Sequence, residues 1–175
     1  MNARLHHHTV TLRPMTLQDV ARVREIDVLS FSLPWSERSY RFELTENKKS
    51  VNWVAETVPQ EGGEGLPIVV GMIVIWAILD EAHIATIAIH PDYRGQGIGR
   101  RLLAGGLLAV YERGARMAYL EVRRSNLTAQ KMYEQFGFVV AGVRPGYYKD
   151  NHEDAILMTL PSIDPLQLKQ FLTQA

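Results

Sequence analysis

The sequence predicts one α/β domain built on a single mixed central sheet flanked by helices. A chain of 175 residues, 46% of them hydrophobic, is long enough to bury one substantial core. Three strand-like segments, 50–58, 68–79 and 84–89, follow one another with only turns or loops between them, which favours antiparallel pairing. Strand-like and helix-like segments then alternate as far as residue 143, and this alternation favours parallel crossovers.

The first elements follow from alternation and from helix-capping residues. Apolar and polar residues alternate over 10–13, which predicts a strand ending at Pro14. Thr16, with Asp19 three residues later, is typical of a helix N-terminus, so a helix is expected over 17–30.

A second helix is expected to begin at Ser36, with Trp35 placed to pack on Tyr40 one turn later. Segment 59–67 contains three glycines between two prolines and predicts a flexible hairpin loop between the next two strands.

The C-terminal half predicts two helices between strands. The helix expected over 97–113 is apolar on nearly every side, which indicates burial. The helix that begins at Asn126 places four apolar or aromatic residues on one face: Ala129, Met132, Tyr133 and Phe136. The remaining expected elements are strands over 117–123, 138–143 and 155–160 and a short helix over 165–172.

Composition excludes several classes of function. Lys and Arg number 19 and Asp and Glu also 19, which argues against binding nucleic acid through bulk positive charge. The absence of cysteine excludes disulfides, thiolate metal sites and a cysteine nucleophile. The longest apolar run, 66–79, is too short to span a bilayer, and the N-terminus has no signal-peptide core. We expect a cytoplasmic monomer or weak dimer, without metal, in which His6–His8 begin a solvated strand or remain from a tag.

The strongest chemical signal is the passage from the strand ending at Ile89 into a glycine-rich turn, 94–99 (RGQGIG), that opens a buried helix. Glycines keep side chains off such a turn, so that backbone N–H groups can converge on an anion at the helix N-terminus. Arg94, Arg100 and Arg101 add positive charge nearby. The segment therefore predicts a diphosphate site, while a turn that serves only chain reversal remains the alternative. It is not a Walker A loop, because no Gly-Lys-Ser/Thr follows.

This turn and five further segments resemble the GNAT acetyltransferases. The further segments are PWSE at 34–37, LEVRRSN at 120–126, YEQFGF at 133–138, and GYY at 146–148 with HEDAILM at 152–158. Together they are most similar to the RimI-type branch, the bacterial ribosomal-protein alanine N-acetyltransferases, and archaeal protein N-terminal acetyltransferases look similar. The resemblance covers about 9–160 and implies a single GNAT-fold domain over 1–175, with 161–175 as a C-terminal tail.

The resemblance implies acetyl-CoA as donor and a protein N-terminus as acceptor, most simply the N-terminal alanine of small-subunit ribosomal protein eighteen. Glu121 is implied as the base, Tyr133 as the acid, and Tyr147 and Tyr148 as acceptor-binding residues. The implied cofactor-binding residues are Ile87, Ala88, Ile89, Arg94, Gly95, Gln96, Gly97, Ile98, Gly99, Arg100 and Asn126. Broader N-terminal specificity, a small-molecule amine as acceptor, and a non-catalytic acyl-CoA-binding module are the alternatives.

Each implied catalytic residue also has an ordinary structural interpretation. Strand alternation places Glu121 on the same face as Arg123, so Glu121 can be a surface residue paired with that arginine. Tyr133 lies on the apolar face of its helix and can be plain aromatic packing. Without cysteine, direct attack of the amine in a ternary complex is the simplest scheme.

Overall fold

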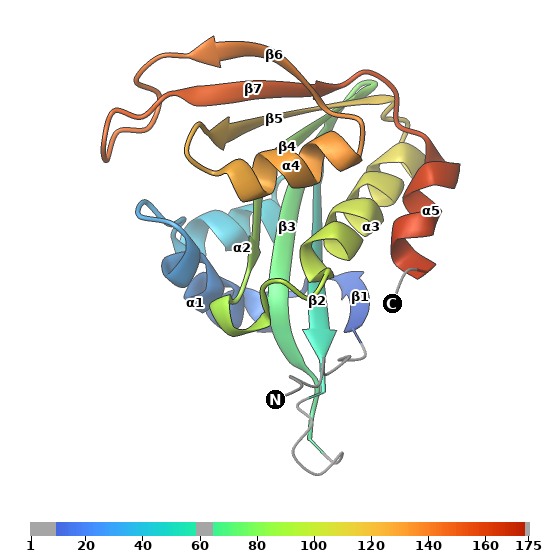
Figure 1. The fold of residues 1–175 in the computed structure, drawn as a ribbon. Helices are drawn as coiled ribbons and strands as arrows, with labels where there is room; N and C mark the ends of the chain where they lie inside the picture. The colour runs from blue at the N-terminus through green and yellow to red at the C-terminus, as the bar shows by residue number, and fades with distance from the viewer. Residues whose placement is uncertain (1–9, 59–64, 174–175) are drawn as a thin grey trace, which may run out of the picture.

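The computed structural model describes residues 10–58 and 65–173, which form one seven-stranded sheet with helices on both faces (Figure 1). The strands lie in the order β1-β2-β3-β4-β5-β7-β6. Their bounds are β1 Val10–Pro14, β2 Ser50–Thr57, β3 Ile68–Ile78, β4 Glu81–Ile89, β5 Met117–Arg123, β6 Val139–Arg144 and β7 Ala155–Leu160. The helices are α1 Val20–Ser30, α2 Glu37–Thr45, α3 Ile98–Glu112, α4 Leu127–Gln135 and α5 Pro165–Thr173.

The predicted mixed α/β sheet and the order of elements are confirmed, with two differences. The helix expected over 17–30 begins as a short 3-10 turn, Leu17–Asp19, before α1. The carboxylate of Asp19 there accepts hydrogen bonds from the Thr16 amide and hydroxyl and from Arg13, which fixes the chain as it leaves β1. The second difference concerns β6, which runs parallel to β5 as expected but does not pair with it, because β7 lies between them.

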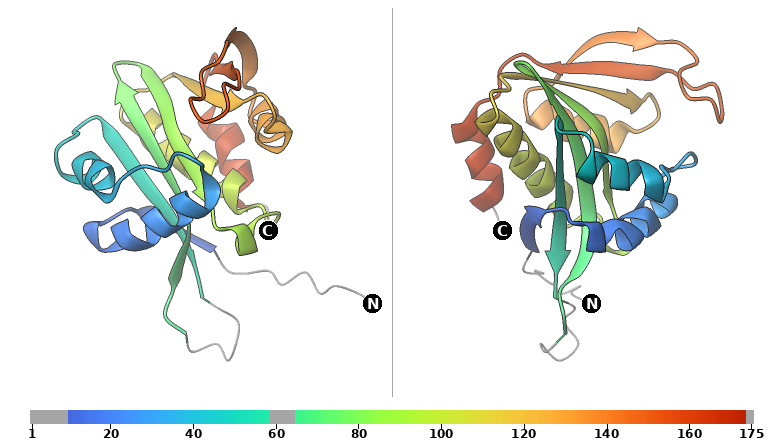
Figure 2. Two further views of the ribbon diagram at one scale, coloured as in Figure 1. Left: turned by 90° about the vertical axis from the view of Figure 1, so that its left-hand side faces the viewer. Right: turned by 180° about the vertical axis from the view of Figure 1, so that it is seen from behind.

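The two faces of the sheet bury separate apolar clusters. On one face α1 and α2 cover a cluster that includes Val23, Ile26 and Tyr40, all fully buried. The expected packing of Trp35 on Tyr40 is confirmed, with ring centroids 5.5 Å apart. Both views of Figure 2 show these helices on one side of the sheet and α3, α4 and α5 on the other.

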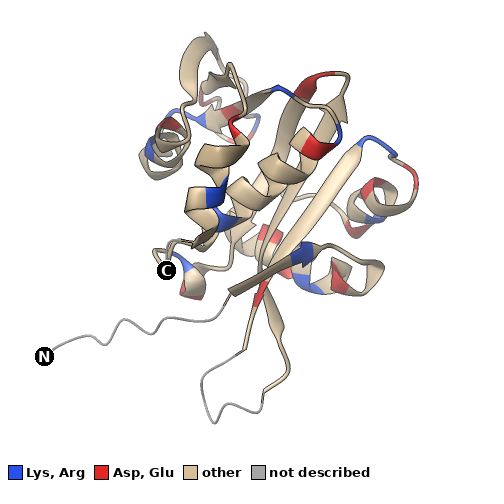
Figure 3. Cartoon of the chain, turned by 90° about the vertical axis from the view of Figure 1, so that its right-hand side faces the viewer, with Lys and Arg blue, Asp and Glu red and all other residues tan. Residues whose placement is uncertain are grey.

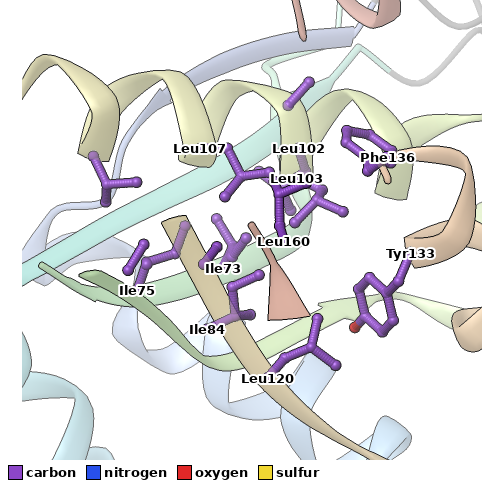
Figure 4. Close-up of a cluster of buried hydrophobic side chains, with 14 of the residues drawn as sticks. Ile73, Ile75, Ile84, Leu102, Leu103, Leu107, Leu120, Tyr133, Phe136 and Leu160 are labelled. Atoms are coloured by element: carbon purple, nitrogen blue, oxygen red, sulfur yellow. The ribbon is translucent and has the colours of Figure 1, made fainter. Parts of the chain in front are cut away.

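The second cluster lies under α3. Leu102, Leu103 and Leu107 of α3 face the isoleucines of β3 and β4, Ile73 and Ile84 among them (Figure 4). The expected burial of this helix is therefore confirmed. The tail beyond residue 160 forms α5, which packs on α3 and stacks Phe171 on Phe136 at 4.1 Å between ring centroids.

The central parallel pair of the sheet separates halfway along its length. β4 pairs with β5 only from Glu81–Met117 to Ile84–Leu120. The register of β4 against β3 slips by one residue at this level, so that Ile84 and Thr86 face consecutive residues of β3 and Ala85 is the extra residue of a bulge. A bulge bends its strand and increases the local twist, and beyond it β4 and β5 diverge. Two strand edges therefore face each other across a gap in the middle of the sheet.

No helix within 10–58 or 65–173 is both long enough and apolar enough to cross a bilayer. β2 and β3 pair antiparallel from Thr57–Ile68 onward, as a hairpin requires. Residues 59–64 of the expected loop and the triplet His6–His8 lie outside the described residues.

The close seating of α3 on the sheet depends on Gly106. A Cβ at this position would lie 2.9 Å from Ile75 Cδ1 and 3.2 Å from Ile73 Cδ1. We predict that Gly106→Val lowers the free energy of unfolding by about 1–3 kcal/mol through overpacking. Glu112→Val, at an exposed position of the same helix, is the control for helix propensity. Urea unfolding measures both, and equal stability of the two variants would contradict this seating.

Candidate active site

A cleft of about 1060 Å³ opens where β4 and β5 separate. Its walls come from both faces of the sheet, since α1 and the loop after it line one side and the start of α3 together with α4 line the other. The predicted site residues that line it are Ile87, Ala88, Ile89, Arg94, Gly95, Gly97, Ile98, Gly99, Arg100, Glu121, Asn126, Tyr133, Tyr147 and Tyr148. Gln96 is the one predicted site residue that does not line the cleft, and its side-chain amide donates to the Asp92 carbonyl at 3.4 Å.

The β4 edge directs backbone groups into the gap. The His90 amide donates to the Val70 carbonyl of β3 at 2.8 Å. Because the residues of an antiparallel pair alternate between bonding to the partner and pointing away, the amides of Ile87 and Ile89 point toward β5. The Ile89 carbonyl accepts from Arg94 Nε at 2.9 Å. The Ile87 and Ile89 amides can therefore donate to an extended ligand that lies between the two strands.

The glycine-rich turn has the backbone conformation that the sequence predicts. Gly95 and Gly97 have φ values of 75° and 77°, which side chains rarely tolerate, and Gly97 is the residue from which α3 begins. A Cβ at Gly95 or Gly97 would meet nothing within 4 Å, so the space above the turn is open. The free N–H groups of the 15-residue helix α3 face this space, and Arg100 lines it.

Helix α4 contributes Asn126 and Tyr133. Asn126 caps the helix, because its side chain accepts a hydrogen bond from the Ala129 amide at 3.1 Å. Tyr133 is 5% exposed and packs its ring on Phe138, with centroids 5.7 Å apart. Figure 4 shows Tyr133 reaching from α4 toward Leu120 of β5. The Tyr133 side chain therefore both packs in the core and lines the cleft.

Burial raises the pKa of the Tyr133 hydroxyl well above its usual value. The phenol is therefore protonated at neutral pH and is a proton donor. Burial and the nearby Tyr148 are the causes of this raised pKa, with no contribution from a hydrogen bond to another described residue, although buried tyrosines usually have such a partner. The donor is thus available to a group that enters the cleft.

Glu121 lies on the opposite face of β5 from Tyr133. Its neighbours Leu120 and Val122 belong to the core shared with α3 and Tyr133, as the predicted strand alternation requires. The Glu121 side chain is 34% exposed, and its carboxylate pairs with Arg144 of β6, at 3.1 Å between Oε1 and Nη1. The suggested pairing of Glu121 with Arg123 is therefore wrong. The side chain of Arg144 on β6 reaches the Glu121 carboxylate instead, across β7, which lies between β5 and β6.

Arg123 pairs with the loop between β6 and β7. Its guanidinium lies 2.8 Å from Asp150 and 3.1 Å from Glu153, and it stacks over the Tyr148 ring at 3.9 Å. Hydrogen bonds from Ser125 lower the pKa of Glu153 to about 2, so this carboxylate is ionised at neutral pH. Burial raises the pKa of the Tyr148 hydroxyl to about 12, so Tyr148 is neutral there.

Sequence reasoning missed several residues of this cleft. Phe31, Ser32 and Leu33, in the loop after α1, line the cleft on the side of that helix, and Lys131 of α4 lines the other side. Their only signal in the sequence was position beside predicted helices. Arg144 carried no signal at all, because its contact with Glu121 depends on the order of the last three strands.

The geometry gives a proton acceptor on one face of a cleft that crosses the sheet and a proton donor on the other. Open strand edges and a helix N-terminus beside the same cleft suit a long ligand that carries amides and a diphosphate. Figure 3 shows that Lys and Arg positions are interspersed with Asp and Glu positions along the helices and strands.

Comparison with known proteins agrees with this geometry. Residues 20–138 match the model of the acetyltransferase (GNAT) family. The [ribosomal protein bS18]-alanine N-acetyltransferase of Escherichia coli is 33% identical, over 86% of this chain and 97% of that protein. A Bacillus subtilis relative, provisionally named for the same activity, is 40% identical over 84% of this chain and 92% of its own length.

Solved structures show the same likeness. The crystal structure of the ribosomal-protein-S18-alanine N-acetyltransferase from Escherichia coli has a TM-score of 0.75 at 32% identity, covering 89% of this chain and 96% of that one. Ard1 from Thermoplasma volcanium has a TM-score of 0.72 at 26% identity, covering 89% of this chain and 99% of its own.

Gly99 allows a test of the turn that does not strain the backbone. It lies in the first turn of α3, and a Cβ there makes only ordinary contacts, 3.5 Å from Met132 Sδ and 3.7 Å from Ile89 Cγ1. An aspartate in the first turn of a helix is favourable for folding. We predict that Gly99→Asp keeps the melting temperature of the wild type but weakens acetyl-CoA binding more than tenfold, since like charges 4 Å apart repel by about 4 kcal/mol near a protein surface.

Gly99→Ala is the matched control, because it adds the Cβ without the charge. Isothermal titration calorimetry with acetyl-CoA measures both variants. Unchanged affinity in a folded Gly99→Asp protein would show that no diphosphate lies at this turn.

Proposed function

The chain belongs to the acetyltransferase (GNAT) family and is an acetyl-CoA-dependent N-acetyltransferase, and we propose that its acceptor is a protein N-terminus, the N-terminal alanine of small-subunit ribosomal protein S18. The observation that carries the proposal is the 33% identity to the Escherichia coli enzyme of that name along 97% of its length, together with a cleft that is open to both faces of the sheet. Such an acceptor is made in the cytoplasm, where we propose that the enzyme acts.

The donor side of the cleft suits acetyl-CoA. Bound acetyl-CoA supplies an activated acetyl thioester. The amides of Gly97 to Arg100 at the start of α3 would hold its diphosphate, with Arg94 and Arg100 adding charge. The amides of Ile87 and Ile89 would donate to the extended pantetheine arm, and Asn126 lines the same cleft.

The remaining chemistry requires one proton acceptor and one proton donor. A peptide α-amine has a pKa of about 7.7–8.0, so a carboxylate is base enough to help remove its proton, directly or through one water. We assign this role to Glu121, which faces the acceptor side. We assign protonation of the departing thiolate to Tyr133, whose hydroxyl is neutral and lacks a partner among the described residues. The amine would attack directly, in a complex that holds both substrates.

Tyr147 and Tyr148 are placed to shape the acceptor path. Both line the cleft on the side of the loop after α1, and their rings meet edge to face with centroids 5.2 Å apart. Tyr147 keeps 39% of its surface exposed, so an incoming peptide can cover it.

Two substitutions separate the proposed acid from the proposed base. Glu121→Gln removes basicity and should lower kcat/KM by about 10²–10⁴ at neutral pH, with partial recovery at high pH, where the free amine forms without help. Tyr133→Phe keeps the ring but removes the proton donor, so its defect should persist at high pH. Measuring kcat/KM against pH on a peptide acceptor tests both.

Both variants should bind acetyl-CoA like the wild type, since neither residue belongs to the glycine turn. Wild-type rates for Tyr133→Phe across the pH range would mean that Tyr133 serves only to pack the core and donates no proton. Wild-type rates for Glu121→Gln would mean that Glu121 has only a structural role, through its ion pair with Arg144.

The acceptor assignment has its own test. We predict that a peptide with the N-terminal sequence of ribosomal protein S18 is acetylated on its α-amine far faster than free lysine or spermidine on any amine. Mass spectrometry identifies the modified nitrogen. Equal rates on peptides that begin with serine or methionine would indicate a broader N-terminal acetyltransferase, and acetylspermidine as main product would reject a protein acceptor. Binding of acetyl-CoA with no turnover on any amine would indicate a non-catalytic module.

A further inference from the structure

Two loops from opposite ends of the chain meet at the acceptor side of the cleft. One is the loop between α1 and α2, which contains Ser32, and the other connects β6 to β7 and contains Asp150. The Ser32 hydroxyl donates a hydrogen bond directly to the Asp150 carboxylate, although 118 residues separate them. Figures 1 and 2 show the two loops on the same side of the molecule.

Arg123 at the end of β5 lies where these loops meet. Its Nη2 donates to Asp150 at 2.8 Å and to the Ser32 hydroxyl at 3.3 Å. Its Nη1 donates to Asn151 and to Glu153, both at 3.1 Å. Arg123, Asp150 and Ser32 therefore form a closed set of hydrogen bonds, which we call the Arg123 latch.

The charged pair of the latch is partly shielded from water, whereas Ser32 at its end is exposed. The side chains of Arg123 and Asp150 are 24% and 20% exposed, and that of Glu153, which also accepts from Arg123, is 15% exposed. The Tyr148 ring covers one face of the guanidinium at 3.9 Å. Isolated exposed pairs contribute little, whereas partly buried charge-assisted bonds that share one planar guanidinium contribute more.

We propose that Arg123 is a positioning residue that holds the two acceptor-side loops at a fixed separation, so that the latch sets the affinity for the acceptor. This inference rests on the proposed function of the cleft. The loop after α1 presents Phe31 and Leu33 to the cleft, and the β6–β7 side presents Tyr147 and Tyr148. Both walls that would contact an acceptor are thus tied to one guanidinium.

The physical consequence is preorganisation. Loops that must be ordered when a ligand binds reduce its affinity by the entropy of ordering, and a latch that orders them beforehand removes this cost. The acetyl donor would lie against β4, α3 and α4, and none of the three side-chain hydrogen bonds of the latch reaches these elements. Loss of the latch should therefore raise KM for the acceptor and leave the affinity for the donor unchanged.

Asp150→Asn tests the latch without altering Arg123. We expect KM for a peptide acceptor to rise about tenfold, the effect of one charge-assisted hydrogen bond, with kcat and the acetyl-CoA dissociation constant within about twofold. Ser32→Ala should give a smaller rise, and the double variant should not add the two effects, because both break the same set of bonds. Glu25→Gln breaks the surface ion pair of Glu25 with Arg22 at 2.7 Å, outside the cleft, and is the matched control.

Hydrogen exchange of the unliganded protein provides a readout that does not depend on activity. If the latch joins the loops, Asp150→Asn accelerates exchange in both the α1–α2 loop and the β6–β7 loop, while Glu25→Gln accelerates neither. Faster exchange in the β6–β7 loop alone, or an unchanged peptide KM in an active Asp150→Asn enzyme, would overturn the proposal. A wild type that acetylates no peptide would instead refute the proposed function, and hydrogen exchange would still decide whether the loops are joined.

Discussion

The cleft exists because β4 and β5 stop pairing halfway along their length. Hydrogen bonding between these central strands stops at Ile84 and Leu120, and the bulge at Ala85 bends β4 away. Backbone groups of an interior strand normally have partners, so the gap creates unpaired donors in the middle of the sheet. The Ile87 and Ile89 amides, the turn at Gly97 and the N-terminus of α3 follow in sequence along one edge of this gap.

The opposite edge of the gap is β5, whose pairing with β7 determines the face to which each β5 side chain points. Pairing with β7 continues to Arg123, so alternate β5 side chains point to opposite faces up to the end of the strand. Glu121 and Arg123 face the loops, and Leu120 and Val122 face Tyr133 and α3. The two charged residues have separate partners from the last hairpin, Arg144 for Glu121 and Asp150 with Glu153 for Arg123. One strand thereby contributes a carboxylate to the cleft and an arginine that pairs with the loop between β6 and β7.

Local signals in the sequence were enough to predict most elements and the glycine turn. Periodicity identified α3 and α4, and Gly95 and Gly97 have the positive φ that their residue type suggests. Non-local geometry was not predictable in this way. The bulge at Ala85 and the insertion of β7 beside β5 depend on register between strands far apart in the chain, so neither the gap nor the Arg144–Glu121 pair followed from spacing. For the same reason Gln96 was grouped with its neighbours, although its side chain turns to Asp92.

Backbone amide NMR during titration with acetyl-CoA shows whether the donor lies in the gap between β4 and β5. If it does, the amide signals of Ile87 and Ile89 shift together with those of Gly97 to Arg100, and hydrogen exchange at Ile87 and Ile89 slows as they gain an acceptor. Saturable binding that leaves the Ile87 and Ile89 amides unchanged in both shift and exchange would mean that the donor lies elsewhere.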